Sequence, residues 1–226
     1  MQFQTITFTR KKDAIAATGG LTQTTKMPCK SWSIPVAACQ TGWYMAQIKG
    51  SICSKCYADR GNYAKYHATI EPAQHARLAA LDEPDLWIAG MTTLIGVDPY
   101  FRWLDSGDIQ SLLHLEMIAE VCRRTPRTRH WLPTREYGIV KAFIAKHGRD
   151  AVPPNLAIRL SAMYIDKPVV VPLSLRGIRG ITTSNVHSKN TSPHGERCPA
   201  PKQGGKCGPC RMCWDSRIEA TTYEQH

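Results

Sequence analysis

The chain has 226 residues, of which 42% are hydrophobic and 21% charged, a composition that is typical of a globular domain and excludes a wholly disordered protein. No apolar run approaches the roughly 18 residues of a membrane span, and the polar start of the chain lacks an apolar signal segment, so we expect a cytoplasmic protein with no membrane partner. Lysine and arginine number 29 against 18 acidic residues, and the net charge of +11 favours an anionic partner: a nucleic acid, a small anionic ligand or substrate, or a metal–thiolate centre.

The hydrophobic pattern predicts helices that alternate with short strands along most of the chain. Residues 1–28 are polar and predict an irregular N-terminal segment or a short edge strand, and a cysteine-bearing loop is expected over residues 39–62. Strands are expected over 31–38, 100–104, 130–132, 156–160 and 180–183, with a further β-branched run over 168–172, and helices over 63–80, 84–95, 111–123 and 137–147. Pro72 is expected to start or break a helix rather than lie inside one. This order predicts a single α/β domain over residues 1–226, built as a partial parallel (β/α) barrel.

Polar residues follow the predicted strands, and in parallel sheets ligands bind at the carboxyl ends of strands. We therefore expect the residues after the strands at 100–104 and 130–132 to bind a cofactor or substrate: Asp105, Ser106, Gly107, Asp108 and Arg135. The alternative is structural: Ser106 or Asp108 would cap the next helix, and Arg135 would form a surface ion pair. Both cysteine-rich segments are also expected at this edge of the sheet.

The most specific motif lies in the segment 198–214. Cys198, Cys207, Cys210 and Cys213 fall within sixteen positions, and the last three are separated by two residues each. Disulfides are rare in the cytoplasm, so closely spaced thiols there indicate metal ligands. The repeated short spacing favours a 4Fe–4S cluster, with zinc as the alternative metal.

A second set of cysteines lies in the loop after the first predicted strand. Cys53 and Cys56 form a Cys-x-x-Cys pair, and Cys39 is the best third ligand because it opens the loop. Cys29 fits either a metal ligand or a buried residue at the start of a strand. Cys122 lies among apolar residues at helical spacing and is expected in the core.

The residues Cys39, Cys53, Cys56 and Tyr57 resemble an expanded form of the radical S-adenosylmethionine motif, although the gap of thirteen residues after Cys39 is longer than in that motif. From the Cys29 region to Trp214, the chain resembles the phage gene product 88 family of iron–sulfur proteins. The resemblance implies a viral protein in the host cytoplasm that binds one or two 4Fe–4S clusters, with S-adenosylmethionine as a further cofactor of the motif.

The number of ligands separates the functions that these clusters would perform. A cubane held by Cys39, Cys53 and Cys56 leaves one iron open for redox or radical-type chemistry on a substrate, whereas a cubane held by four cysteines is closed. The alternatives are a metal-stabilised nucleic-acid-binding protein without catalysis and an electron-transfer or host-interaction protein. The basic residues support nucleic-acid binding only if they share one face, and the tryptophans are more often core residues than base-stacking platforms.

Overall fold

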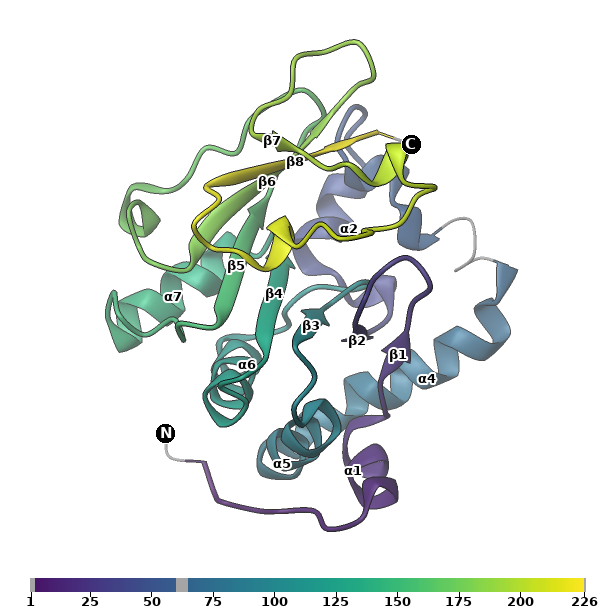
Figure 1. Cartoon of the computed structure of the whole chain (residues 1–226), viewed down its shortest axis with the longest axis vertical. Coiled ribbons are helices and arrows are strands. Elements are labelled where there is room, and N and C mark those ends of the chain that lie inside the picture. Colours follow the sequence, from purple (N-terminus) through teal and green to yellow (C-terminus); the bar gives the residue numbers. More distant parts are fainter. Residues whose placement is uncertain (1–2, 60–64, 226) are drawn as a thin grey trace.

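The computed structural model describes residues 3–59 and 65–225, and its described part contains one eight-stranded sheet in the order β1-β2-β3-β4-β5-β6-β8-β7 (Figure 1). The strands are β1 (Thr22–Gln23), β2 (Lys30–Trp32), β3 (Tyr100–Trp103), β4 (Arg129–Thr134), β5 (Leu156–Ser161), β6 (Ile181–His187), β7 (Glu196–Arg197) and β8 (Ala220–Glu224). Only β1 pairs antiparallel, and the other pairs are parallel. Because β1 and β7 end the sheet without pairing to each other, the predicted α/β class is confirmed as an open sheet and not a closed barrel.

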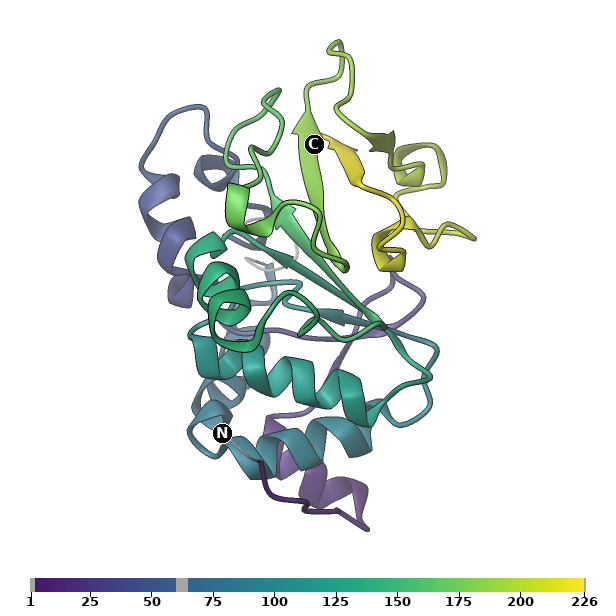
Figure 2. The same ribbon diagram turned by 90° about the vertical axis from the view of Figure 1, so that its left-hand side faces the viewer.

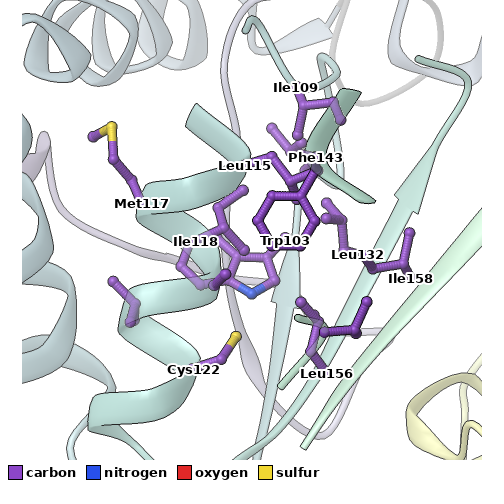
Figure 3. Close-up of a cluster of buried hydrophobic side chains, with 14 of the residues drawn as sticks. Trp103, Ile109, Leu115, Met117, Ile118, Cys122, Leu132, Phe143, Leu156 and Ile158 are labelled. Carbon is purple, nitrogen blue, oxygen red and sulfur yellow. The ribbon is translucent and has the colours of Figure 1, made fainter. Parts of the chain in front are cut away.

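The longer helices cover one face of this sheet. The helices are α1 (Lys11–Thr18), α2 (Gln40–Ala46), α4 (His67–Ala79), α5 (Pro84–Ile95), α6 (Leu112–Arg124) and α7 (Tyr137–His147). Figure 2 shows α5, α6 and α7 in teal on one side of the sheet, and the yellow C-terminal segment on the other. The main hydrophobic core lies between these helices and the sheet, and Cys122 is fully buried in it as predicted (Figure 3).

Local sequence signals explain where these helices begin and end. Pro84 occupies the first turn of α5, where its missing N–H costs no hydrogen bond. Ser111 caps α6 by accepting a hydrogen bond from the backbone N–H of His114 at 3.1 Å. Gly148 ends α7 with a φ of 89°, which favours glycine. The predicted bounds of α5 and α7 are therefore confirmed, and those of α6 differ by one residue at each end.

The opposite face of the sheet carries a second, smaller apolar cluster. Along β3, Phe101 and Trp103 are buried in the main core, and the alternate residues Tyr100 and Arg102 face the other side. Four buried residues form the centre of this second cluster: Cys29, Trp131, Cys213 and Trp214. We call this side the inner face, and the segment 198–214 covers it.

Several predicted elements were wrong. The N-terminal segment contains the short edge strand β1, which was one of the two expectations, but the rest of it is not irregular, because α1 packs so closely on α5 that a Cβ at Gly90 would lie 2.6 Å from Thr18. The strand predicted over 31–38 ends at Trp32, and Pro35 precedes a short 3₁₀ turn. The loop from 39 contains α2, and its residues 60–64 lie outside the described part. Pro72 lies inside α4, where it removes only one backbone hydrogen bond from a helix of 13 residues.

The C-terminal third differs most from the prediction. Residues 168–172 form no strand, and β6 extends to His187, which is 1% exposed and shares a 2.9 Å hydrogen bond with Thr222. The cysteine-rich segment does not follow the last strand, since the chain re-enters the sheet as β8 between β6 and β7. Threonine-rich β8 was missed because its pairing partners are remote in sequence.

Candidate metal centres

Three thiols lie in the loop that follows β2 at the carboxyl edge of the sheet, as predicted. Cys39 directly precedes α2, and Cys53 opens a 3₁₀ turn that the Cys56 N–H closes by donating to the Cys53 carbonyl at 3.2 Å. A Cβ added at Gly42 would lie 3.5 Å from the sulfur of Cys39 and 3.8 Å from that of Cys53. The two sulfurs therefore border the same small space, which glycine leaves open. We call Cys39, Cys53 and Cys56 the carboxyl-edge trio.

The trio thiols influence one another electrostatically. Burial raises the pKa of Cys39 to about 12, and the negative charges of Asp108, Cys56 and Cys53 raise it further, while Arg135 opposes them. Burial also raises the pKa of Cys53, which Arg135 lowers. A positively charged metal ion or cluster that replaces the thiol protons would lower these pKa values, because it would stabilise the thiolates.

Hydrogen bonds to segments that follow β3, β4 and β5 hold the trio loop in place. The backbone N–H and hydroxyl of Thr41 both donate to the Glu136 carboxylate at 2.7 Å. Gln110 donates to the Ala38 carbonyl at 3.1 Å, and the Ile52 N–H donates to the carbonyl of Met163 at 3.0 Å. The loop is thus tied to the strand ends where ligands bind in parallel sheets.

Asp108 joins two strand ends and does not cap a helix. Its carboxylate accepts hydrogen bonds from the Thr134 hydroxyl at 2.6 Å and from the backbone N–H groups of Ile109 and Arg135 at 2.8 Å. Burial raises the pKa of Asp108 to about 6, although these hydrogen bonds act in the opposite direction. Ser111 performs the capping role that the structural alternative gave to Ser106 or Asp108.

The other predicted cofactor-binding residues have distinct environments at this edge. Gly107 has a φ of 77°, and a Cβ there would lie 2.3 Å from Ile34, so close packing requires the glycine. Ser106 is 4% exposed, and among the described residues its hydroxyl has no hydrogen-bond partner. The side chain of Arg135 donates to the Ala162 carbonyl at 3.0 Å and forms no ion pair with any residue in the described part of the chain, so the alternative surface ion pair is not observed there. Asp105 is buried, and its carbonyl accepts a hydrogen bond from Tyr57.

The remaining cysteines outside the core gather on the inner face. We call them the inner-face group: Cys29, Cys198, Cys207, Cys210 and Cys213. Backbone hydrogen bonds hold the segment 198–214 in place. The Cys198 N–H donates to the Thr222 carbonyl at 2.8 Å, and the Cys207 N–H donates to the Lys26 carbonyl at 2.9 Å. The segment therefore does not project from the carboxyl edge, which was the expectation, but lies across the sheet.

Two arginines lie beside the inner-face thiols. Burial raises the pKa of Cys29 to about 12, and Arg102 and Arg211 oppose this change. The guanidinium of Arg102 lies 4.4 Å from the ring centre of Trp131, and that of Arg211 lies 5.1 Å from that of Tyr100. Stacking on aromatic rings fixes both positive charges near the thiols.

Arg159 anchors the C-terminal segment and was missed in the sequence. It lies in β5 with 0% exposure and donates to five backbone carbonyls, those of Thr183, Met212, Cys213, Asp215 and Ile218. An arginine within a strand that is otherwise apolar was the available signal, because such a buried charge needs several acceptors.

A tyrosine–arginine pair connects the two thiol regions. Tyr57 directly follows Cys56, and its hydroxyl accepts a hydrogen bond from Arg102 at 3.1 Å. Arg102 also lies near Cys29, Cys207 and Cys213, whose pKa values its charge lowers. The two regions are therefore neighbours on the inner side of β3.

The donor chemistry fits a thiolate-bound metal, because all nine cysteines are free thiols and none forms a disulfide. Among residues 3–59 and 65–225, however, no three histidine, cysteine or carboxylate side chains are arranged to hold a metal ion as they stand. The loops thus gather the thiols without converging them on one point.

Comparison with known proteins gives one match. The family model described as Gene product 88 matches residues 4–216, almost the whole chain. The chain belongs to the gene product 88 family. No curated protein and no solved structure matches the chain.

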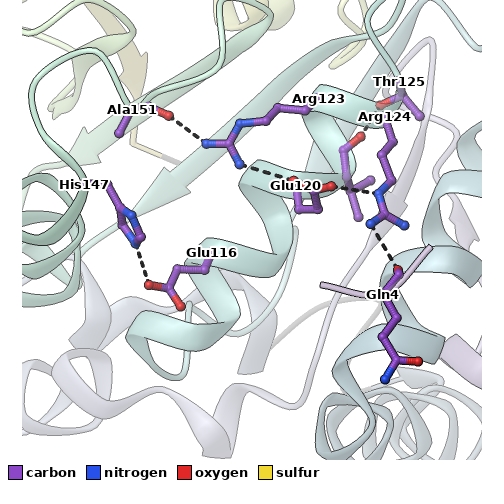
Figure 4. A network of polar contacts seen from close by, with 9 residues as sticks. Gln4, Glu116, Glu120, Arg123, Arg124, Thr125, His147 and Ala151 are labelled. Atoms are coloured by element: carbon purple, nitrogen blue, oxygen red, sulfur yellow. Dashed lines mark hydrogen bonds and ion pairs between the residues drawn. The ribbon is translucent and has the colours of Figure 1, made fainter. Parts of the chain in front are cut away.

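The surface of this gene product 88 protein offers little support for base stacking. Five of its six tryptophans are buried, and Trp43 is 57% exposed beside Tyr44 on α2. Arg123 and Arg124 both pair with Glu120 and also donate to backbone carbonyls (Figure 4). Nucleic-acid binding stays a prediction. No described helix of the gene product 88 chain is long and apolar enough to cross a membrane.

A cavity of about 630 Å³ lies on the helical side of the sheet, away from the trio and the inner-face group. It is lined by the N-terminal segment and by α5, α6 and α7, and its charged residues pair with one another. Glu116, for example, accepts from Lys146 at 2.7 Å and is hydrogen-bonded to His147 at 2.6 Å (Figure 4). The acidic residues that line this cavity are already paired with basic residues and offer no free charge to a ligand. The thiol regions are therefore the better candidate sites.

Proposed function

We propose that this protein, for which its family suggests a bacteriophage origin, binds a 4Fe–4S cluster at the carboxyl-edge trio and acts in redox or radical-type chemistry in the host cytoplasm. The observation that carries the proposal is the meeting of Cys39 and Cys53 beside the gap at Gly42, with Cys56 in the same turn. Three thiolates leave one iron of a cubane without a protein ligand, and such an iron binds substrate or cofactor.

The two candidate metals place different demands on the thiols. A tetrahedral zinc ion needs its four ligands around one point, whereas the cysteines of a cubane bind different irons at separate corners. No described group of three side chains surrounds one point as it stands, so the thiols would have to move to bind a zinc ion. The trio supplies three thiols, which matches a cubane with one open iron and is one fewer than a structural zinc site uses.

The neighbouring polar groups support a small anionic substrate at the open iron. Arg135 lies close enough to lower the pKa of the Cys53 thiol, and a guanidinium binds carboxylate or phosphate in a planar fork. Ser106 adds a buried hydroxyl that has no described partner. S-adenosylmethionine is a second candidate ligand. However, close packing on Ile34 accounts for the glycine at position 107, and three hydrogen bonds account for Asp108, so neither residue is evidence that S-adenosylmethionine binds.

Metal analysis of cysteine variants tests the proposal. Wild-type protein, purified without oxygen, is compared with Cys53→Ser and with Cys122→Ser, whose thiol lies in the core. We expect wild type and the core control to contain iron and acid-labile sulfide, and Cys53→Ser to lose the part held by the trio. Equal iron and sulfide in all three proteins would contradict the proposal, as would zinc in place of iron in wild type.

An open iron has a spectroscopic consequence. S-adenosylmethionine or a small carboxylate added to the reduced cluster would change its EPR signal on binding to the open iron. An unchanged signal with both additives would exclude an accessible open site. A response to the carboxylate alone would support the substrate and remove S-adenosylmethionine as the ligand.

A further inference from the structure

The inner-face group contains five thiols, one more than a closed metal centre uses. They come from two segments that are remote in sequence and converge on the inner face of the sheet. We propose that Cys29, Cys198, Cys207 and Cys210 bind a second, closed thiolate metal centre, and that Cys213 is not a ligand. This assignment is independent of the carboxyl-edge trio and differs from the four C-terminal cysteines that the motif suggests.

Cys198, Cys207 and Cys210 form the centre of the proposed site. The Cys210 N–H donates to the Cys207 carbonyl at 3.1 Å, so the two-residue gap forms a tight turn. Gly208 lies in this turn with a φ of 52°, a conformation that glycine tolerates. Burial raises the pKa of Cys207, and the charges of Cys198 and Cys210 raise it further, so the three thiols lie within electrostatic reach of one another.

Cys29 is brought to these three thiols by a backbone contact. The Cys207 N–H donates to the Lys26 carbonyl at 2.9 Å, so the segment before β2 runs beside the cysteine turn. Cys29 is 6% exposed, and no hydrogen bond to its sulfur occurs among the described residues. After burial and Arg102, the charge of Cys207 is the next influence on its pKa. A buried thiol with no other partner, next to a cysteine of the turn, suits a ligand.

Cys213 has a structural role instead. Its sulfur lies 3.1 Å from the Tyr223 hydroxyl on β8, and its carbonyl accepts a hydrogen bond from Arg159 at 3.1 Å. The next residue, Trp214, packs between Tyr100 and Trp131 and donates to the Phe101 carbonyl at 2.8 Å. These contacts fix Cys213 to β5 and β8.

The surrounding charges match a dianionic centre. Four thiolates leave a net charge of −2 around either a zinc ion or an oxidised cubane, so the electrostatic requirement is the same for both. Arg102 and Arg211 both lower the pKa of Cys29 and of Cys207, so they lie where this negative charge would develop. The thiols do not surround one point as they stand, and binding would draw the turn at Gly208 toward Cys29.

The decisive experiment removes the trio first. In the full chain with Cys39, Cys53 and Cys56 all changed to Ser, iron, sulfide and zinc are measured per chain after anaerobic purification. We expect one centre to remain, and its metal content distinguishes a cluster from zinc. On this background, Cys29→Ser is expected to lose most of that metal, and Cys213→Ser to retain it.

Further variants keep the outcome interpretable. Cys29→His supplies another side chain that can ligate zinc or a cluster iron and is expected to recover part of the metal that Cys29→Ser loses, whereas a folding defect would not be repaired by histidine. Circular dichroism compares the fold of each variant with its parent. Loss of metal in Cys213→Ser with retention in Cys29→Ser would overturn the assignment, and a background without metal would exclude the second centre. The difference in metal content between wild type and the variant that lacks the three trio cysteines measures the metal bound by the trio alone.

Discussion

The carboxyl-edge trio and the inner-face group differ in how the chain gathers their thiols. The trio comes from a single loop, and all three of its cysteines are partly exposed. The inner-face group joins two remote segments, includes the buried Cys29 and Cys213, and lies beside two arginines. An exposed set with three thiols suits chemistry on a ligand, whereas a partly buried set with fixed counter-charges suits a permanent structural centre.

The comparison also shows which interactions each region requires. The trio depends on side-chain hydrogen bonds to strand ends, above all the two that Glu136 accepts from Thr41, while Asp108 holds the ends of β3 and β4 together beside it. The inner-face group depends on Arg159 and on backbone pairing with β8. Because few contacts are shared, substitutions in one region are expected to leave the other largely intact.

Arg159→Met is expected to have the largest effect. The change leaves five backbone carbonyls without their charged donor, and we expect a loss of about 4 kcal/mol in the free energy of unfolding. Urea unfolding measures this loss, with Arg123→Met as an exposed control. Metal at the inner-face group should fall while metal at the trio persists. A loss no larger than that of the control would contradict the anchoring role of Arg159.

Asp108→Asn is expected to affect the opposite region. Asparagine can place only one acceptor oxygen where the carboxylate serves three donors, so we expect a loss of about 2 kcal/mol. Removing the negative charge should also lower the pKa of Cys39, which Asp108 raises. In metal-free protein, Cys39 should then react faster with iodoacetamide at a fixed pH. Unchanged alkylation of Cys39, followed by mass spectrometry, would argue against this coupling.

Acid should weaken the support of the trio loop through His114. Burial lowers the pKa of His114 to about 3, and its Nδ1 accepts a hydrogen bond from the Gln110 N–H at 3.2 Å. The unfolded chain, with an ordinary histidine pKa near 6.5, binds the proton more readily, so stability falls as the pH drops from about 6.5 toward 3.

Between pH 7 and pH 5 the expected contribution of His114 is about 2 kcal/mol. Urea unfolding at the two pH values would show a smaller loss for His114→Gln than for wild type. His130 is also buried, with its pKa lowered to about 3, and it remains in both proteins as an internal reference. Equal losses in the two proteins would rule out the contribution of His114.

Tyr57→Phe is the mildest change and tests the contact between the regions. It removes the hydroxyl that accepts from Arg102 and donates to the Asp105 carbonyl, and we expect a loss of about 1 kcal/mol. If both centres bind metal, their EPR or visible spectra should each shift slightly. Spectra that change in one centre alone would show that the pair does not link them.

The parts of the fold that were predictable from sequence depend on local signals. The bounds of α5 and α7 follow from apolar periodicity with Pro84 and Gly148 at the ends. β8 and the role of Arg159 were not predictable, because each depends on partners far away along the chain. The sequence predicted that Asp108 lies after a strand, but it did not predict that Asp108 accepts hydrogen bonds from residues at the end of the next strand, β4.

The same distinction holds for the candidate sites. The place of the trio at a strand end could be predicted because Cys39, Cys53 and Cys56 share one loop. The neighbourhood of Cys29 could not be, since no spacing motif relates it to Cys207. The hydrogen bond between Cys207 and Lys26, together with the packing of Cys29 in one cluster with Cys213 and Trp214, brings the two segments together.

That hydrogen bond has a consequence for synthesis of the protein. Cys29 and its neighbour Cys207 are 207 − 29 = 178 positions apart, which corresponds to roughly 10 to 35 seconds of translation at about 5 to 20 residues per second. During this interval the Cys29 thiol has emerged without its partner, so it is open to oxidants and to other metals in the cell. Assembly of the inner-face group therefore depends on conditions that keep a nascent thiol reduced until the later segment arrives.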